Sequence, residues 1–237
     1  MKLVTFGCSW TNGVGMHYTK GMSREEYCNK RKGNNDIKDK YAFRGILAER
    51  FGYTNINFAK GGHSNQKQER FAIEYFNENL PDDTVVLWGL TTIARTEFCM
   101  DDMWTNVMSS ECERDERIEY YFKHFYNEKL ELERLCNMMI HWNKFFEAHK
   151  IPNLWFQTFN TYEFPQNIDR LLPKDLLTYL TCHHTKDYHA STWKVDSKRI
   201  EEAKDKGLVN PISLHPTKET HIILADILEK KVREILY

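Results

Sequence analysis

Long apolar runs are missing from this sequence of 237 residues. None approaches the ~18 residues that a membrane-spanning helix needs, so we expect no membrane partner. An excess of one charge is missing too: 33 Lys and Arg stand against 34 Asp and Glu, for a net charge of −1. Because no bulk field then attracts a polyanion, we expect no nucleic-acid partner either.

Paired cysteines are also lacking. The six cysteines include no CxxC motif and have no regular spacing, which is typical of a reducing compartment. Met1 leads directly into an apolar run without the pattern of a signal peptide, so we expect a cytoplasmic protein. Internal repeats and low-complexity tracts are absent from the sequence.

What is present alternates between strand and helix patterns. Short apolar or alternating runs predict strands at 2–6, 54–59, 84–88 and 153–159. Apolar residues at helical spacing predict helices at 41–51, 66–80, 128–150 and 217–236. This order favours an α/β fold with three layers, in which helices cover both faces of a central parallel sheet of about five strands.

Two segments break the pattern, at about 92–127 and 160–209. We interpret them as insertions, the first a lid or side lobe, within a single domain spanning 1–237. The polar stretch 18–40 is predicted to be an exposed loop or a poorly formed helix. Its basic triplet, Lys30 to Lys32, lies near Asp36 and Asp39 and is best explained as a solvated loop.

The first candidate site residue is Ser9. The predicted strand 2–6 ends at Gly7, which places the Ser9 hydroxyl at the carboxyl edge of the sheet, where open α/β sheets bind ligands. A helix beginning after this turn would aim N–H groups at an anion that develops nearby. The alternative is an ordinary strand-to-helix turn in which Ser9 caps the helix.

Four short blocks together resemble the SGNH (GDSL-like) hydrolases. They are Gly7-x-Ser9-x-Thr11, Asn57-x-Ala59-x-Gly61-Gly62, Gly89-x-Thr91, and His215-Pro216 followed by a helix with His221. The blocks span the chain in the family's order, and the resemblance implies a flavodoxin-like sheet. The sequence looks most similar to divergent members found in bacteriophage genomes.

The resemblance implies acyl transfer. Ser9 matches the nucleophile, His215 the general base, and Gly62 the glycine whose N–H helps to form the oxyanion hole, with Thr91 as a further donor. The expected substrate is an ester or acetyl group, including one on a carbohydrate. No cofactor is implied, and the sequence does not indicate an oligomeric state.

The sequence departs from the family pattern at three positions. Cys8 replaces an aspartate, Thr91 an asparagine of the oxyanion hole, and Ile212 the acid three residues before the histidine. Without this acid, the His215 imidazole must be oriented by Ser213, a backbone carbonyl or a distant acid such as Asp187 or Asp196. These departures keep open a second hypothesis, a non-catalytic protein that binds a glycan or assembles into a larger particle such as a virion.

Four further residues are candidates for substrate binding: Trp10, His63, Asn65 and Arg95. Each has a structural alternative. Trp10 could stack on a sugar or pack in the core, Asn65 could cap the next helix, and Arg95 could pair with an acid of the insertion. Cys182, His183, His184 and His189 are metal-ligand types, but adjacent histidines point in different directions, so we predict no metal site.

Overall fold

The central sheet is parallel, as the sequence predicts. In the computed structural model, which describes residues 1–31, 35–79, 82–164, 166–181 and 197–237, its strand order is β2 (Thr54–Asn57), β1 (Lys2–Phe6), β3 (Thr84–Leu90) and β6 (Asn153–Gln157). This sheet has four strands where about five were expected. Beyond β6, Leu171 forms a single parallel bridge with Trp155, so the fifth position of a flavodoxin-like sheet is reduced to one bridge.

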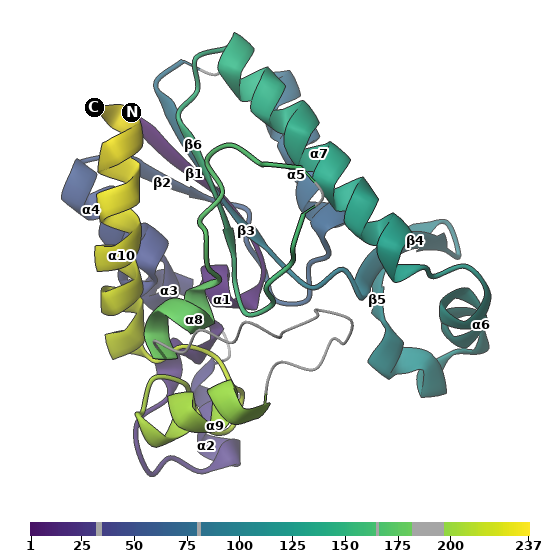
Figure 1. The fold of residues 1–237 in the computed structure, drawn as a ribbon. Helices are drawn as coiled ribbons and strands as arrows, with labels where there is room; N and C mark the ends of the chain where they lie inside the picture. Colours follow the sequence, from purple (N-terminus) through teal and green to yellow (C-terminus); the bar gives the residue numbers. More distant parts are fainter. Residues whose placement is uncertain (32–34, 80–81, 165, 182–196) are drawn as a thin grey trace.

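Two apolar cores lie on opposite faces of this sheet, because successive side chains of a strand alternate in direction. Leu3 and Leu87 belong to one core, and Val4 and Trp88 to the other. Helices α4 (Phe43–Phe51) and α10 (Lys218–Leu236) cover the first face, while α5 (Asn65–Glu78) and α7 (Glu128–Ala148) cover the second. Figure 1 shows the sheet between α10 and α7, which confirms the three-layer α/β/α architecture.

The covering helices begin and end where local chemistry predicts. Gly52 ends α4 in the left-handed conformation with φ 67°. The side chains of Ser64, Asn127 and Thr217 accept hydrogen bonds at the N-termini of α5, α7 and α10. The shorter helices are α1 (Ser9–Asn12), the 3₁₀ helix η1 (Val14–His17), α8 (Leu176–Thr181) and α9 (Ser197–Asp205).

The polar stretch 18–40 is more ordered than its composition indicates. It contains α2 (Arg24–Arg31), and α3 (Asn35–Tyr41) follows. One reason is Tyr27, whose ring is 1% exposed and whose hydroxyl donates to the Val14 carbonyl at 2.8 Å. A single aromatic anchor of α2 therefore ties this region to the loop after Ser9.

The first predicted insertion forms a side lobe. It consists of the antiparallel hairpin β4 (Arg95–Met100) and β5 (Met103–Met108), the 3₁₀ helix η2 (Ser109–Arg114) and α6 (Glu116–His124). Asp101 and Asp102 form the hairpin turn, with φ of 50° and 62°. In Figure 1 the lobe extends away from the sheet beyond the end of α7. No helix within the described ranges is long and apolar enough to cross a membrane.

Candidate active site

The strand order brings two of the predicted blocks together. β1 pairs in parallel with β3, with Phe6 opposite Trp88, so the segments that follow them leave the same edge of the sheet side by side. Ser9 begins α1, and its N-cap residue is Cys8, so the alternative in which Ser9 itself caps the helix is wrong. Ser9 therefore lies at the carboxyl edge of the parallel sheet, where open α/β sheets bind their ligands.

Thr11 is wedged between two glycines of these blocks. An ideal Cβ at Gly7 would lie 2.3 Å from Thr11 Oγ1, and one at Gly89 would lie 2.5 Å from the same atom. Any side chain at either glycine would therefore collide with Thr11. The glycine of the first block and that of the third thus make room for one buried threonine, which fixes the spacing of the two strand ends.

His215 lies on a loop that closes on itself. The Asn210 N–H donates to the His215 carbonyl at 2.8 Å, and the Leu214 N–H donates to the Asn210 carbonyl at 2.8 Å. Leu214 adopts a left-handed conformation with φ 57°, unusual for a leucine, which turns the chain sharply before His215. The loop conformation is therefore set by backbone contacts immediately before the histidine.

The Ser9 segment also packs directly against this histidine loop. A Cβ at Gly15 would lie 2.2 Å from the Pro216 carbonyl oxygen, so only glycine fits there. Tyr27 adds a polar link: because its hydroxyl proton goes to Val14, the Ser213 hydroxyl at 3.1 Å is the donor to Tyr27. Ser213, one of the candidates to orient His215, therefore has its own proton engaged elsewhere.

A cavity of about 190 Å³ joins the predicted nucleophile and base. Its lining residues come from the Ser9 turn, the segments after β3 and β6, the lobe, α9 and the histidine loop: Ser9, Trp10, Thr92, Ala94, Arg95, Met108, Ser109, Ser110, Phe159, Ile200, Ser213, Leu214 and His215. Ser9 is only 6% exposed. Four predicted residues, Ser9, His215, Trp10 and Arg95, thus line one cavity of a size suited to a small acyl group.

Trp10 packs in the core, as one of its two alternatives predicts, while stacking on a sugar stays a prediction. It is 3% exposed and packs in the core against Phe159, with ring centroids 5.8 Å apart, yet both rings line the cavity. Phe159, Met108 and Ile200 in the other walls were not predicted from the sequence. Phe159 follows β6 and could have been found by the rule that ligands bind at strand ends, whereas Met108 and Ile200 carry no such signal.

Thr91 is held from two sides. Asn65 accepts from the Thr91 N–H at 3.0 Å and donates to the Thr91 carbonyl at 3.1 Å. Arg95 donates through Nη1 to Thr91 Oγ1 at 3.0 Å and through Nε to Met108 Sδ at 3.0 Å. The structure therefore gives Asn65 a positioning contact with Thr91; it does not line the Ser9 cavity, and substrate contact by Asn65 stays a prediction.

The second block contributes Gly62 and His63. Gly62 has φ 85°, and nothing lies within 4 Å of an ideal Cβ, so its backbone conformation rather than crowding requires glycine. Neighbouring Gly61 approaches Ser9, since its ideal Cβ would be 3.8 Å from Ser9 Cβ. Gly61 and His63 line a separate polar hollow of about 620 Å³ with Asn12 and Asn57, so the structure does not bring His63 into the Ser9 cavity.

Two buried histidines are neutral near pH 7. Burial, followed by the charges of Lys67 and Lys60, lowers the pKa of His63 to about 4. Burial, followed by the charges of Arg44 and His215, lowers the pKa of His221 to about 3. His221 Nδ1 accepts from the Phe43 N–H at 3.3 Å, so this histidine of the fourth block supports the start of α4.

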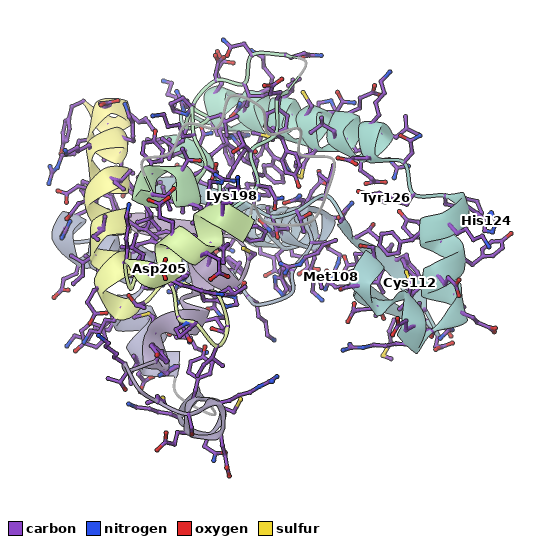
Figure 2. The ribbon with its side chains drawn as sticks, turned by 60° about the horizontal axis from the view of Figure 1, so that its bottom comes forward. Met108, Cys112, His124, Tyr126, Lys198 and Asp205 are labelled. Atoms are coloured by element: carbon purple, nitrogen blue, oxygen red, sulfur yellow. The ribbon has the colours of Figure 1, made fainter. Side chains whose placement is uncertain are left out.

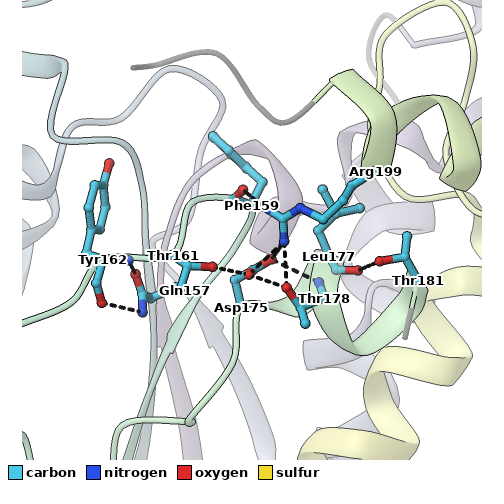
Figure 3. A network of polar contacts seen from close by, with 9 residues as sticks. All are labelled: Gln157, Phe159, Thr161, Tyr162, Asp175, Leu177, Thr178, Thr181 and Arg199. Atoms are coloured by element: carbon cyan, nitrogen blue, oxygen red, sulfur yellow. Dashed lines mark hydrogen bonds and ion pairs between the residues drawn. The ribbon is translucent and has the colours of Figure 1, made fainter. Parts of the chain in front are cut away.

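A buried ion pair supports the wall opposite the lobe. Arg199 and Asp175, which are 2% and 0% exposed, meet at 3.0 Å. Figure 3 shows Thr161 and Thr178 donating to the same carboxylate, and Arg199 reaching the Phe159 carbonyl. Because Phe159 and the neighbour of Arg199, Ile200, both line the cavity, this network holds two of its apolar walls.

The lobe supplies the remaining wall. Figure 2 shows Met108 at the inner end of the lobe and His124 at its outer edge.

Several residues considered as metal ligands or as acids behind His215 lie outside the described residues: Cys182, His183, His184, His189, Asp187 and Asp196. Among those that the structure describes, no three His, Cys, Asp or Glu side chains gather closely enough to hold a metal ion.

Solved structures resemble this chain at low identity. A carbohydrate esterase family 2 enzyme from Corynascus thermopiles (Myceliophthora fergusii) aligns with TM-score 0.51 and 11% identity over 99% of this chain and 66% of that one. TesA aligns with TM-score 0.50 and 10% identity over 99% of each chain. A lipolytic protein of the G-D-S-L family from Desulfitobacterium hafniense DCB-2 aligns with TM-score 0.48 and 12% identity over 97% and 98%.

No family model and no curated protein matches the chain. At these identities the structural likeness shows the fold alone. The chain has an SGNH/GDSL-like fold, as the four sequence blocks predict.

Proposed function

We propose that this protein is a serine hydrolase that cleaves a small ester or acetyl group, with Ser9 as nucleophile and His215 as general base. The observation that carries the proposal is the shared cavity: Ser9 and His215, from opposite ends of the chain, line the same cavity at the carboxyl edge of the sheet. The esterase named among the structures with this fold supports a carbohydrate ester as substrate.

The reaction would proceed in two steps. Ser9 Oγ attacks the ester carbonyl and its proton passes to His215, which then protonates the departing alcohol. Water next attacks the acyl–Ser9 ester, loses its proton to His215 and releases the acid, which regenerates Ser9. The N–H groups of Ser9 and Gly62 stabilise the tetrahedral oxyanion in each step.

Thr91 serves as the third oxyanion donor in this proposal. Its Oγ1 accepts from Arg95, which leaves its own hydroxyl proton to be donated elsewhere. Ile212 offers no carboxylate behind His215 at the position where the resembled family has one. Since loss of the acid alone costs a triad enzyme ~10⁴ in turnover, we expect slow hydrolysis by a Ser–His pair.

Labelling with a fluorophosphonate, followed by peptide mapping, tests the nucleophile. We expect modification of Ser9, and loss of both labelling and ester turnover in Ser9→Ala with an unchanged thermal unfolding curve. Ser110→Ala removes another serine of the same cavity and should retain labelling. Labelling that persists in Ser9→Ala would refute the assignment.

The second candidate is a non-catalytic protein that binds a glycan or assembles into a larger particle. The replacements at Thr91 and Ile212 favour it, because each removes a group on which hydrolysis in the resembled family depends. An unlabelled Ser9 together with saturable binding of an oligosaccharide would support this candidate over the hydrolase.

A further inference from the structure

Among the described residues that line the Ser9 cavity, Arg95 is the one Lys or Arg side chain. It stands at the first residue of β4, where the lobe leaves the sheet. Its two hydrogen-bond acceptors are uncharged: the Thr91 hydroxyl at 3.0 Å and the Met108 thioether at 3.0 Å. Neither neutralises the positive charge that the guanidinium brings to the cavity.

Two acids of the lobe, Glu97 and Glu111, are already engaged with other residues. Glu97 is 3% exposed and pairs with Arg70 at 2.9 Å and Lys67 at 3.6 Å. Glu111 accepts from the Met108 N–H at 3.0 Å and pairs with Arg114 at 2.8 Å. Within the described part of the chain, no carboxylate lies within 4.0 Å of the Arg95 guanidinium.

A partly buried cation without a counter-ion is costly, because its hydration is reduced and nothing replaces it. A guanidinium also offers several donors in a planar fork that matches the two oxygens of a carboxylate or phosphate. Ser109 and Ser110 line the cavity on the same lobe and provide hydroxyl donors beside it. The lobe side of the cavity is therefore suited to an anionic group.

We propose that the substrate is a small ester carrying a negatively charged oxygen group, a carboxylate or phosphate, which Arg95 binds while Ser9 attacks the carbonyl. This inference rests on the proposed hydrolase function and names the substrate class. The cavity of about 190 Å³ suits a small group beside Ser9.

Matched substrates test the proposal. On the alcohol side, para-acetoxybenzoate is compared with para-acetoxybenzamide; on the acyl side, mono-para-nitrophenyl glutarate is compared with para-nitrophenyl pentanoate. We expect the wild type to prefer the charged member of at least one pair through a lower KM. The pair that shows the preference identifies which part of the ester carries the charge.

Variants of Arg95 make the test specific. Arg95→Met removes the charge at similar length and should abolish the preference, raising KM for the charged ester about 10–100-fold with little change in kcat, as expected for a hydrogen bond to a charged group. Arg95→Lys keeps the charge and should retain part of the preference. Arg114→Met removes an exposed positive charge from the same lobe and should leave the preference intact.

Two results would overturn the proposal. One is a wild type that treats both members of each pair alike. The other is an Arg95→Met variant that loses kcat equally on charged and neutral esters, which would place Arg95 at the oxyanion or in support of Thr91. If Ser9 is inert and no ester is cleaved, calorimetry with para-acetamidobenzoate and para-acetamidobenzamide tests the anion site directly. Binding of para-acetamidobenzoate that is lost in Arg95→Met supports the site. Equal affinities of the wild type for the two compounds reject it.

Discussion

The two sides of the Ser9 cavity are built differently. The sheet side is part of the packed interior, where Trp10, Phe159 and Ile200 are 3%, 9% and 5% exposed. The lobe carries Met103 and Trp104 at 66% and 58% exposure. It meets the loop after β3 and helix α5 through polar contacts: Arg95 with Thr91, Arg70 with Glu97, and Asn106 with Ser64.

This difference separates the residues proposed for acyl transfer from those that would set substrate preference. Residues that would carry out acyl transfer are fixed by packing that also holds the fold together, so changes there cost stability. The lobe is attached by a few hydrogen bonds and ion pairs, each worth about 1 kcal/mol or somewhat more, so it can change without unfolding the sheet. We expect variants of the two sides to separate into those that lower stability and those that alter substrate preference.

Breaking the buried ion pair should have the largest effect. Arg199→Met leaves the Asp175 carboxylate buried without its cation, which typically costs about 3–5 kcal/mol. Chemical denaturation should show this loss. The double variant Asp175→Asn/Arg199→Met removes both charges and should recover much of the stability; equal destabilisation in the double variant would contradict this account.

Gly62→Ala should next impair catalysis. At φ 85° an alanine is strained, so the segment should shift and its N–H should leave the oxyanion position that we propose for it. Loss of one oxyanion donor lowers kcat about 10²–10³-fold, which initial rates on an ester would measure. Gly61→Ala is the matched control, since its Cβ makes only ordinary contacts at 3.8 Å and should leave kcat nearly unchanged.

His221 should make the sheet side sensitive to acid. Its folded pKa of about 3 lies below the ordinary 6.5, so between these values the unfolded chain binds a proton that the folded protein excludes. The free energy of unfolding is therefore not reduced by this group above pH 6.5. Below pH 6.5 it falls by about 1.4 kcal/mol per pH unit as the pH drops toward 3. Thermal unfolding from pH 7 to 4 should show a smaller slope in His221→Gln, and an unchanged slope would count against it.

The smallest stability effect is expected in the lobe. Asn106→Ala removes the acceptor of the Ser64 N–H at 3.0 Å, worth about 0.5–1.5 kcal/mol. Because this bond helps to place β5 and hence Met108, KM for a charged ester should rise while the unfolding midpoint moves little. Thr105→Ala, on the adjacent hairpin residue, is the control; a large stability loss in Asn106→Ala would remove the distinction between the two sides.

The sequence predicted the sheet side well because that side follows from hydrophobic pattern. The run 84–88 indicated a buried parallel strand, and β3 is buried throughout. The end of the first predicted strand then placed Ser9 at the sheet edge, while Thr91 came from the resemblance to a known family. The resemblance to a known family added His215, which no local pattern would have joined to Ser9.

The lobe could not be predicted in the same way. Its hairpin turn uses Asp101 and Asp102, which lack the Asn-Gly or Asp-Gly signal of a tight turn. The contacts of Arg95 depend on where that hairpin leaves the sheet, which residue spacing does not encode. The bidentate contact of Asn65 with Thr91 is likewise a matter of three-dimensional placement.

Thr11, wedged between Gly7 and Gly89, has a consequence for how this sequence can vary. A side chain at either glycine becomes possible only after position 11 has lost bulk, so the order in which substitutions arise matters. The three positions should show epistasis: Gly7→Ala should be deleterious alone and partly rescued by Thr11→Gly. In a collection of natural variants, an enlarged residue at 7 should therefore occur together with a reduced one at 11, and an enlarged residue at 89 should also require a change at Phe156, 2.7 Å from its ideal Cβ.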